Sequence, residues 1–204
     1  MLSRFFRIFS PCSRHTDSMR HRISAINLEN CIVLFFVAAF VGYLWEVLLF
    51  FLTEGQLYNR GFFYGPWLPV YGTGAVLIFL ALYPQRKQPI RCFFLSAVIG
   101  AVVEFFTGKL LHTLFCRRYW NYTGEFMHIG GYVCMYSVLG FALAGSLFVC
   151  VAAPFLLSRW GRLPRRIRRI ILAVIFFFFL IDAAVSLFFP NEGSGIAVPA
   201  ALTG

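Results

Sequence analysis

Long apolar stretches alternate with short polar segments along this chain. A transmembrane helix needs about 20 predominantly apolar residues, and four of the stretches reach that length. The second stretch is shorter and begins beside Pro66 and Pro69, so we expect an irregular or re-entrant start there. The pattern predicts an all-α fold, a polytopic transmembrane bundle over 28–189 with about five spans. The apolar stretches cover residues 28–52, 67–83, 92–115, 132–157 and 170–189.

Composition places the chain in lipid rather than in water. Of its 204 residues, 60% are hydrophobic and only 13% are charged, and the mean hydropathy is +0.77. A soluble domain carries roughly 25% charged residues. Too little polar surface remains to cover a water-facing globule, so the lipid bilayer is the first expected partner.

The net charge of +10 raises the question of nucleic-acid binding. The basic residues stand in short blocks between apolar stretches, with no basic and aromatic binding face, so we expect no nucleic-acid partner. Fourteen Lys and Arg lie in one set of polar segments and three in the other. By the positive-inside rule, the N-terminus is cytoplasmic and the tail 190–204 is extracytoplasmic. The richer set comprises the arm 1–27 and the loops 84–91 and 158–169.

Two glutamates interrupt the apolar stretches. Glu46 and Glu104 each follow a glycine by four residues, Gly42 and Gly100, which suggests a parallel two-helix repeat of 28–83 and 92–157. A charged side chain at mid-membrane costs roughly 2.5–3.5 kcal/mol on insertion scales, so both should face protein or a water-filled cavity. One interpretation is a shared polar site that opens outward. The other is a structural ion pair with Arg60 or Lys109.

The segment after the first stretch is dense in glycine, proline and aromatic residues. It begins with Asn59 and Arg60, and its turn formers indicate a structured plug or pocket wall. Arg60 is a candidate clamp for a carboxylate or a phosphate. The loop after the third stretch carries another aromatic cluster, beside two histidines, His112 and His128, whose roles stay open.

Several catalytic and metal-binding motifs are absent from the sequence. It contains no G-x-x-x-x-G-K-[ST], no H-E-x-x-H and no G-x-S-x-G. We therefore expect no ATP hydrolysis by this chain itself. The six cysteines form no C-x-x-C pair, so we predict no metal site, no disulfide framework and no cofactor.

From Gly42 and Glu46 onward, the chain resembles a bacterial membrane-protein family described as "Putative ABC-transporter type IV", or CmpB-type. The motifs are Asn59-Arg60-Gly61-Phe62, Gly65-Pro66, Pro69-Val70-Tyr71-Gly72, Glu104 and Trp120-Asn121-Tyr122, within about residues 30–155. The resemblance implies a permease-like component in the bacterial plasma membrane, working with a separate ATPase subunit. The family pattern has an aspartate at Asn121, an asparagine at His128 and an acidic residue at His112. An acid or ion-ligand role at those positions is therefore not implied here.

Three functions follow from these observations. The first is a transport component with an outward-facing polar site. The second is an intramembrane enzyme acting on lipid or cell-envelope intermediates, with a glutamate as general base. The third is a structural or regulatory membrane partner, and homo-oligomerisation stays open beside assembly with an ATPase. The substrate-binding candidates are Glu46, Asn59, Arg60, Glu104, Trp120 and Asn121.

Overall fold

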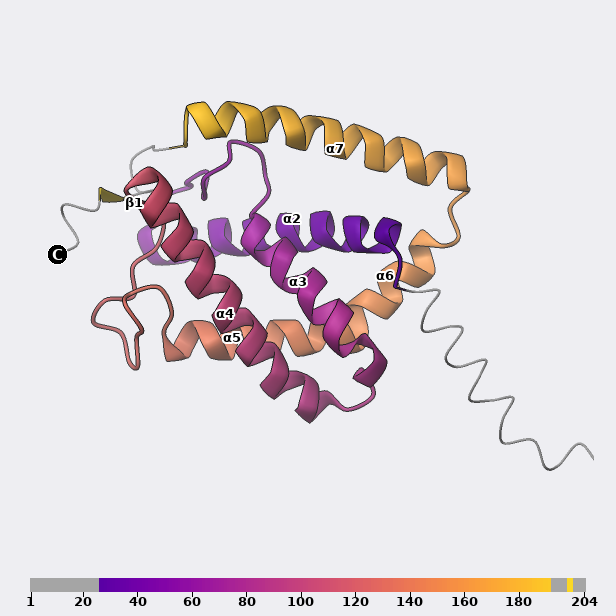
Figure 1. The fold of residues 1–204 in the computed structure, drawn as a ribbon, viewed down its shortest axis with the longest axis horizontal. Coiled ribbons are helices and arrows are strands. Elements are labelled where there is room, and N and C mark those ends of the chain that lie inside the picture. Colours follow the sequence, from indigo (N-terminus) through magenta and orange to yellow (C-terminus); the bar gives the residue numbers. More distant parts are fainter. Residues whose placement is uncertain (1–25, 192–197, 200–204) are drawn as a thin grey trace, which may run out of the picture.

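The computed structural model describes residues 26–191 and 198–199, and helices make up most of this part of the chain (Figure 1). This confirms the predicted all-α bundle. A two-residue antiparallel pairing joins β1 (Arg117–Arg118) to β2 (Val198–Pro199). The predicted arm 1–27 and tail 190–204 lie largely outside the described residues. The helical elements are α2 (Leu28–Glu54), α3 (Pro69–Leu82), the 3₁₀ turn η2 (Tyr83–Gln85), α4 (Pro89–Phe115), α5 (Met135–Leu147), the π-helical segment η3 (Phe148–Ala152), α6 (Ala153–Trp160) and α7 (Arg165–Phe188).

Within the described residues, four helices are long and apolar enough to cross a membrane. They are α2, α4, α7 and the continuous helix Met135–Trp160, which joins α5, η3 and α6. The chain is therefore a multi-pass membrane protein. Helix α3 has 14 residues and reaches only about 21 Å, less than the roughly 30 Å of a bilayer core. It begins at Pro69, and a fifth complete crossing stays a prediction.

Helix α7 begins earlier than its apolar stretch. Its first residue is Arg165, which follows Pro164, whereas hydropathy alone predicts a start at 170. Arginine is a good helix former, so the basic residues before 170 adopt helical backbone although they are too polar for the membrane interior. Part of the predicted loop 158–169 is thus the first turn of α7.

A proline explains the bend between α5 and α6. Pro154 has no N–H, and in a regular helix its ring would collide with the carbonyl group of Cys150. The π-helical turn η3, which spans Phe148–Ala152, widens the backbone at this place. Figure 1 shows α6 leaving the direction of α5.

Two antiparallel helix pairs form most of the bundle, α2 with α3 and α4 with α5. In each pair, a glycine lets an aromatic side chain lie directly on the helix backbone. A Cβ atom on Gly42 would collide with Cγ of Tyr71, and one on Gly100 would lie 2.5 Å from Cβ of Phe141. The two glycines that suggested a repeat therefore have the same packing role in both pairs.

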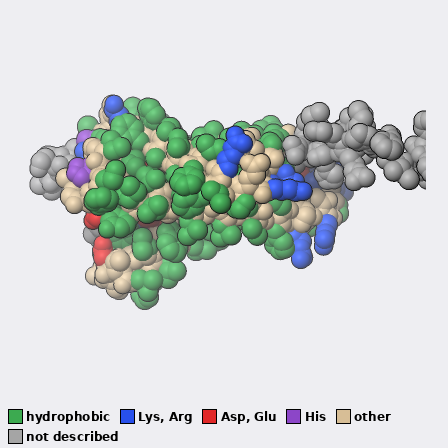
Figure 2. All heavy atoms as spheres, turned by 90° about the horizontal axis from the view of Figure 1, so that it is seen from below, with side chains coloured by type: hydrophobic (Ala, Val, Ile, Leu, Met, Phe, Trp, Pro, Cys, Tyr) green, Lys and Arg blue, Asp and Glu red, His purple; other side chains and the backbone are tan. Residues whose placement is uncertain are grey.

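The two ends of the bundle differ in chemistry. We call the "loop end" the end where α2, α4 and α7 finish, and the "basic end" the end where α2 and α7 begin. Lys and Arg side chains gather toward the basic end and acidic and His side chains toward the loop end, with apolar side chains between (Figure 2). A closed apolar core, including Leu34, Phe79 and Val149, fills the half nearer the basic end. Under the predicted orientation, the basic end faces the cytoplasm.

The close approach of α4 and α5 gives a test. Gly100→Ala should lower the stability by about 1–3 kcal/mol, because the new methyl group collides with Phe141. Gly140→Ala, on the same helix pair, meets no atom within 4 Å and should leave stability unchanged or slightly raised. Thermal unfolding of both variants in detergent measures this difference, and equal midpoints would refute the packing.

Candidate functional site

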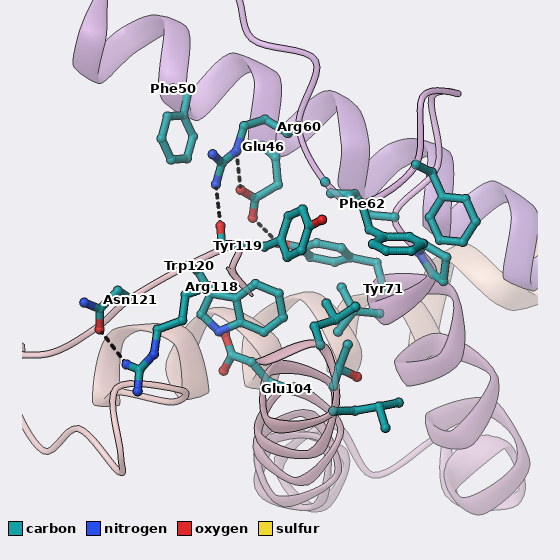
Figure 3. A pocket seen from close by; sticks show the side chains of 18 of the residues that line it. Glu46, Phe50, Arg60, Phe62, Tyr71, Glu104, Arg118, Tyr119, Trp120 and Asn121 are labelled. Carbon is teal, nitrogen blue, oxygen red and sulfur yellow. Dashed lines mark hydrogen bonds and ion pairs between the residues drawn. The ribbon is translucent and has the colours of Figure 1, made fainter. Parts of the chain in front are cut away.

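A cavity of about 880 Å³ lies at the loop end of the bundle (Figure 3). Helix α2 packs mainly on α3, and α4 mainly on α5, so the ends of α2 and α4 stand apart and form its two walls. The loops 55–68 and 116–134 cover it. These loops meet through Phe62 and Tyr119, which form a small buried cluster with Phe115 of α4.

Glu46 and Arg60 form the first polar group of the cavity. Oε2 of Glu46 lies 3.9 Å from Nε of Arg60, and the Tyr71 hydroxyl donates to Oε1 at 2.6 Å. The structure thus provides the ion pair that the sequence offered as one interpretation of Glu46. Tyr71 belongs to α3, so the pair also joins α2 to its partner helix.

Three groups hold the Arg60 side chain, which is only 6% exposed. Its Nε pairs with Glu46, and its Nη2 donates to the carbonyl oxygen of Tyr119 at 3.2 Å. The guanidinium carbon lies 3.7 Å from the centroid of the Phe50 ring. Burial lowers the pKa of Arg60, and the nearby Glu46 carboxylate opposes that shift. Arg60 therefore connects α2 to both covering loops.

Glu104 is the second polar group and is more deeply buried, at 4% exposed. Tyr122 donates to Oε1 at 3.0 Å and Ser137 to Oε2 at 2.7 Å. Lys109, the other ion-pair partner considered from sequence, lies instead 5.9 Å from the centroid of the Phe105 ring. Within residues 26–191, Glu104 makes no ion pair. Burial, reinforced by the Glu104 charge, raises the pKa of the Tyr122 phenol, so it stays protonated and able to donate.

Trp120 and Asn121 also line the cavity, and both hold the second loop in shape. The indole N–H of Trp120 donates to the carbonyl oxygen of Tyr132 at 2.9 Å. Oδ1 of Asn121 accepts hydrogen bonds from Arg118 at 3.2 Å and from the Thr123 hydroxyl at 2.7 Å. An amide at position 121 thus fits an organising role in the turn.

Asn59 is the one predicted binding residue that does not line the cavity. Its side-chain Nδ2 donates to the carbonyl oxygen of Tyr64 at 2.8 Å, and its backbone carbonyl oxygen accepts from Nδ2 of Asn191 at 3.0 Å. The side chain is therefore turned into its own loop. Local sequence placed Asn59 beside Arg60 but could not show that the two side chains point different ways.

Asp182 of α7 was missed by the sequence analysis, although it anchors the first loop. Its carboxylate accepts from the backbone N–H groups of Tyr64 at 3.1 Å and Gly65 at 2.9 Å, and from the indole N–H of Trp67. The signal that could have found it is the same as for Glu46: a carboxylate inside an apolar stretch.

The two histidines do not line the cavity. Nδ1 of His112 lies 2.6 Å from the Tyr132 hydroxyl, a hydrogen-bonded arrangement between α4 and the second loop. His128 is exposed on that loop.

The helices and the cavity define a multi-pass membrane protein with a half-buried polar site at one end of the bundle. Residues 33–187 match the family "Putative ABC-transporter type IV", and the chain belongs to that family. The match extends beyond the 30–155 covered by the sequence motifs and includes Asp182. No curated protein and no solved structure matches the chain.

Removing the Arg60 charge tests the ion pair. Arg60→Met should destabilise the protein by about 3 kcal/mol, because it leaves Glu46 partly buried without its cation. The double variant Glu46→Gln/Arg60→Met should recover more than half of that loss, since neither charge then remains. Chemical unfolding in detergent of the wild type, the two single variants and the double variant gives the four free energies of the cycle. Additive losses would show that the two groups are not coupled.

Asp182 gives a second test. Asp182→Ala should speed hydrogen exchange at the amides of Tyr64 and Gly65 by tenfold or more, because both lose their acceptor. Ser186→Ala is the matched control, since Ser186 donates to the same carboxylate at 3.3 Å without holding the loop. Unchanged exchange in Asp182→Ala would exclude the anchoring role.

Proposed function

We propose that this chain is the solute-binding membrane component, a permease-like subunit, of an ABC-type transport system, with its loop end outside the cell. The observation that carries the proposal is the shared cavity. Glu46, Arg60, Glu104, Trp120 and Asn121 come from two helices and two loops, yet all line it. The family to which the chain belongs supports a role in transport.

The cavity has the chemistry of a site for an organic solute. Ligand pockets generally measure about 300–1,000 Å³ and combine apolar walls with a few oriented polar groups. Here leucine and phenylalanine side chains form much of the wall, among them Leu111, Phe115 and Phe141. The polar groups are held in place by hydrogen bonds, which favours selective binding over a non-specific void.

The position of the cavity supports a loading state of a transporter. The cavity lies toward the loop end, while fully buried Leu34, Phe79 and Val149 close the half near the basic end. Release of the solute at the basic end then requires the side chains of this core to separate. The bundle has an irregular element there, since Val149 lies within the π-helical segment η3.

The basic end offers a surface for an ATPase partner. The turn between α6 and α7 is fixed by Glu29, which pairs with Nε of Arg168 at 3.1 Å and accepts from the Trp160 indole N–H at 3.1 Å. Arginines around this turn are exposed, including Arg162 and Arg166. A rigid positive surface at the end that we place in the cytoplasm suits an acidic partner.

The arrangement of Arg60 favours binding over lipid-phosphate chemistry. A phosphate clamp needs guanidinium donors directed at the substrate. Here the guanidinium group faces Glu46, the Tyr119 carbonyl oxygen and the Phe50 ring.

Filling the cavity tests the transport proposal. Thr107 lines the cavity, whereas its neighbour Phe106 is 64% exposed on the lipid side of α4. In a deletion strain, Thr107→Trp should abolish the solute uptake that the wild-type gene restores, and Phe106→Trp should restore it. Uptake is found by comparing small-molecule pools between deletion and complemented cells. Full complementation by Thr107→Trp would exclude the cavity as the transport site.

The partner surface is tested by co-purification. An ATPase subunit should co-purify with the tagged wild-type chain, and Arg162→Glu/Arg166→Glu should reduce its recovery at least tenfold. Lys109→Glu/Arg117→Glu, toward the loop end and outside the cavity lining, is the charge-matched control. Equal recovery of the ATPase subunit with both variants would exclude the basic end as its binding surface.

A further inference from the structure

Glu104 is a buried acidic group of the cavity without an ion-pair partner among the described residues. Arg60 is paired with Glu46. Arg118 donates to Asn121 and lies 4.9 Å from the centroid of the Tyr132 ring. Glu104 has only hydroxyl donors and makes no ion pair in the described part of the chain. A carboxylate in this position is costly unless a cation joins it or a proton neutralises it.

The hydroxyl donors hold Glu104 in a fixed orientation. Tyr122 and Ser137 each occupy one carboxylate oxygen, from the second loop and from α5. A carboxylate has about four acceptor positions, so two hydrogen bonds leave capacity for a further donor or cation. Glu104 lines the cavity, which makes this capacity available to a bound molecule.

Aromatic rings line the same cavity as Glu104. They come from every part of the wall, and one of them, Phe50, already has the Arg60 guanidinium group over its face. A cavity that combines a carboxylate with aromatic rings has the chemistry that recognises organic cations, because ring faces attract positive charge. The other rings of the lining are those of Phe62, Phe63, Tyr71, Phe115, Tyr119, Trp120, Tyr122 and Phe141.

The remaining wall suits a bulky apolar body. Leu49 of α2 and Leu110 and Leu114 of α4 line the cavity and are also 40–63% exposed on the bundle surface. The space between α2 and α4 is therefore bordered by apolar side chains that lipid also reaches. Among residues 26–191, no group of three or more His, Cys, Asp or Glu could hold a bare metal ion.

From these observations, we propose that the cavity binds lipophilic organic cations, with the Glu104 carboxylate as their counter-ion. This deepens the proposed transport function by naming the class of cargo. The cationic group lies among the rings beside Glu104, and the apolar body lies against the leucines of α2 and α4.

The test uses the full-length chain in nanodiscs and two probes of equal shape and opposite charge. Tetraphenylphosphonium should bind saturably in equilibrium dialysis, after correction for empty nanodiscs, and tetraphenylborate at least tenfold more weakly. Glu104→Gln should weaken phosphonium binding at least tenfold and remove most of the charge preference. Glu125→Gln, which alters an exposed carboxylate outside the cavity lining, should change neither value.

The outcomes separate this inference from the proposed function. Equal affinity of the wild type for both probes overturns the cation proposal even if Glu104→Gln fails to fold. Equal phosphonium binding by wild type and folded Glu104→Gln overturns it too. If neither probe binds while Thr107→Trp still abolishes uptake, the cargo class is wrong and the transport proposal survives. If the phosphonium binds through Glu104 but Thr107→Trp supports full uptake, the binding site stands and the transport proposal fails.

Discussion

A carboxylate on a lipid-surrounded helix must find its partners inside the protein, and the architecture of this bundle depends on that constraint. Glu46 takes Arg60 and Tyr71 as partners, and neither belongs to its own helix. Glu104 and Asp182 likewise take partners from loops, and Glu104 takes one from α5 as well. Each acidic group therefore joins its helix to a segment distant in sequence. Loops that would otherwise lie in water are held against the bundle.

The cavity follows from the same arrangement. Close packing at Gly42 and Gly100 joins the helices into two pairs, and the polar groups of Glu46, Arg60 and Glu104 line the cavity between the ends of these pairs. In the half near the basic end, apolar side chains such as Leu34, Phe79 and Val149 form the core of the described residues. A bundle that is packed at one end and hollow at the other, in a family described as transporters, suits a binding protein better than a structural one.

The sequence predicted the features that depend on local pattern. Apolar length located the helices, and the glutamates were visible because they break that pattern. What it could not supply depends on long-range contacts. Asn59 and Arg60 are neighbours, but only Arg60 lines the cavity, because Asn59 bonds within its own loop and to Asn191. Asp182 broke the apolar pattern as visibly as Glu46 did, yet the loop residues that donate to it lie more than 100 residues away.

Helix α7 has few direct backbone contacts with the other helices, and Asp182 attaches it to the first loop. The helix runs unbroken from the arginine-rich turn at Arg165 to Asp182, about 25 Å further along its axis. A helix is stiff over such a length, so a push at the basic end would displace Asp182 by a similar amount. The backbone that Asp182 holds lies in the same loop as Arg60. Helix α7 therefore links the arginine-rich turn at the basic end directly to the loop that lines the cavity at the loop end.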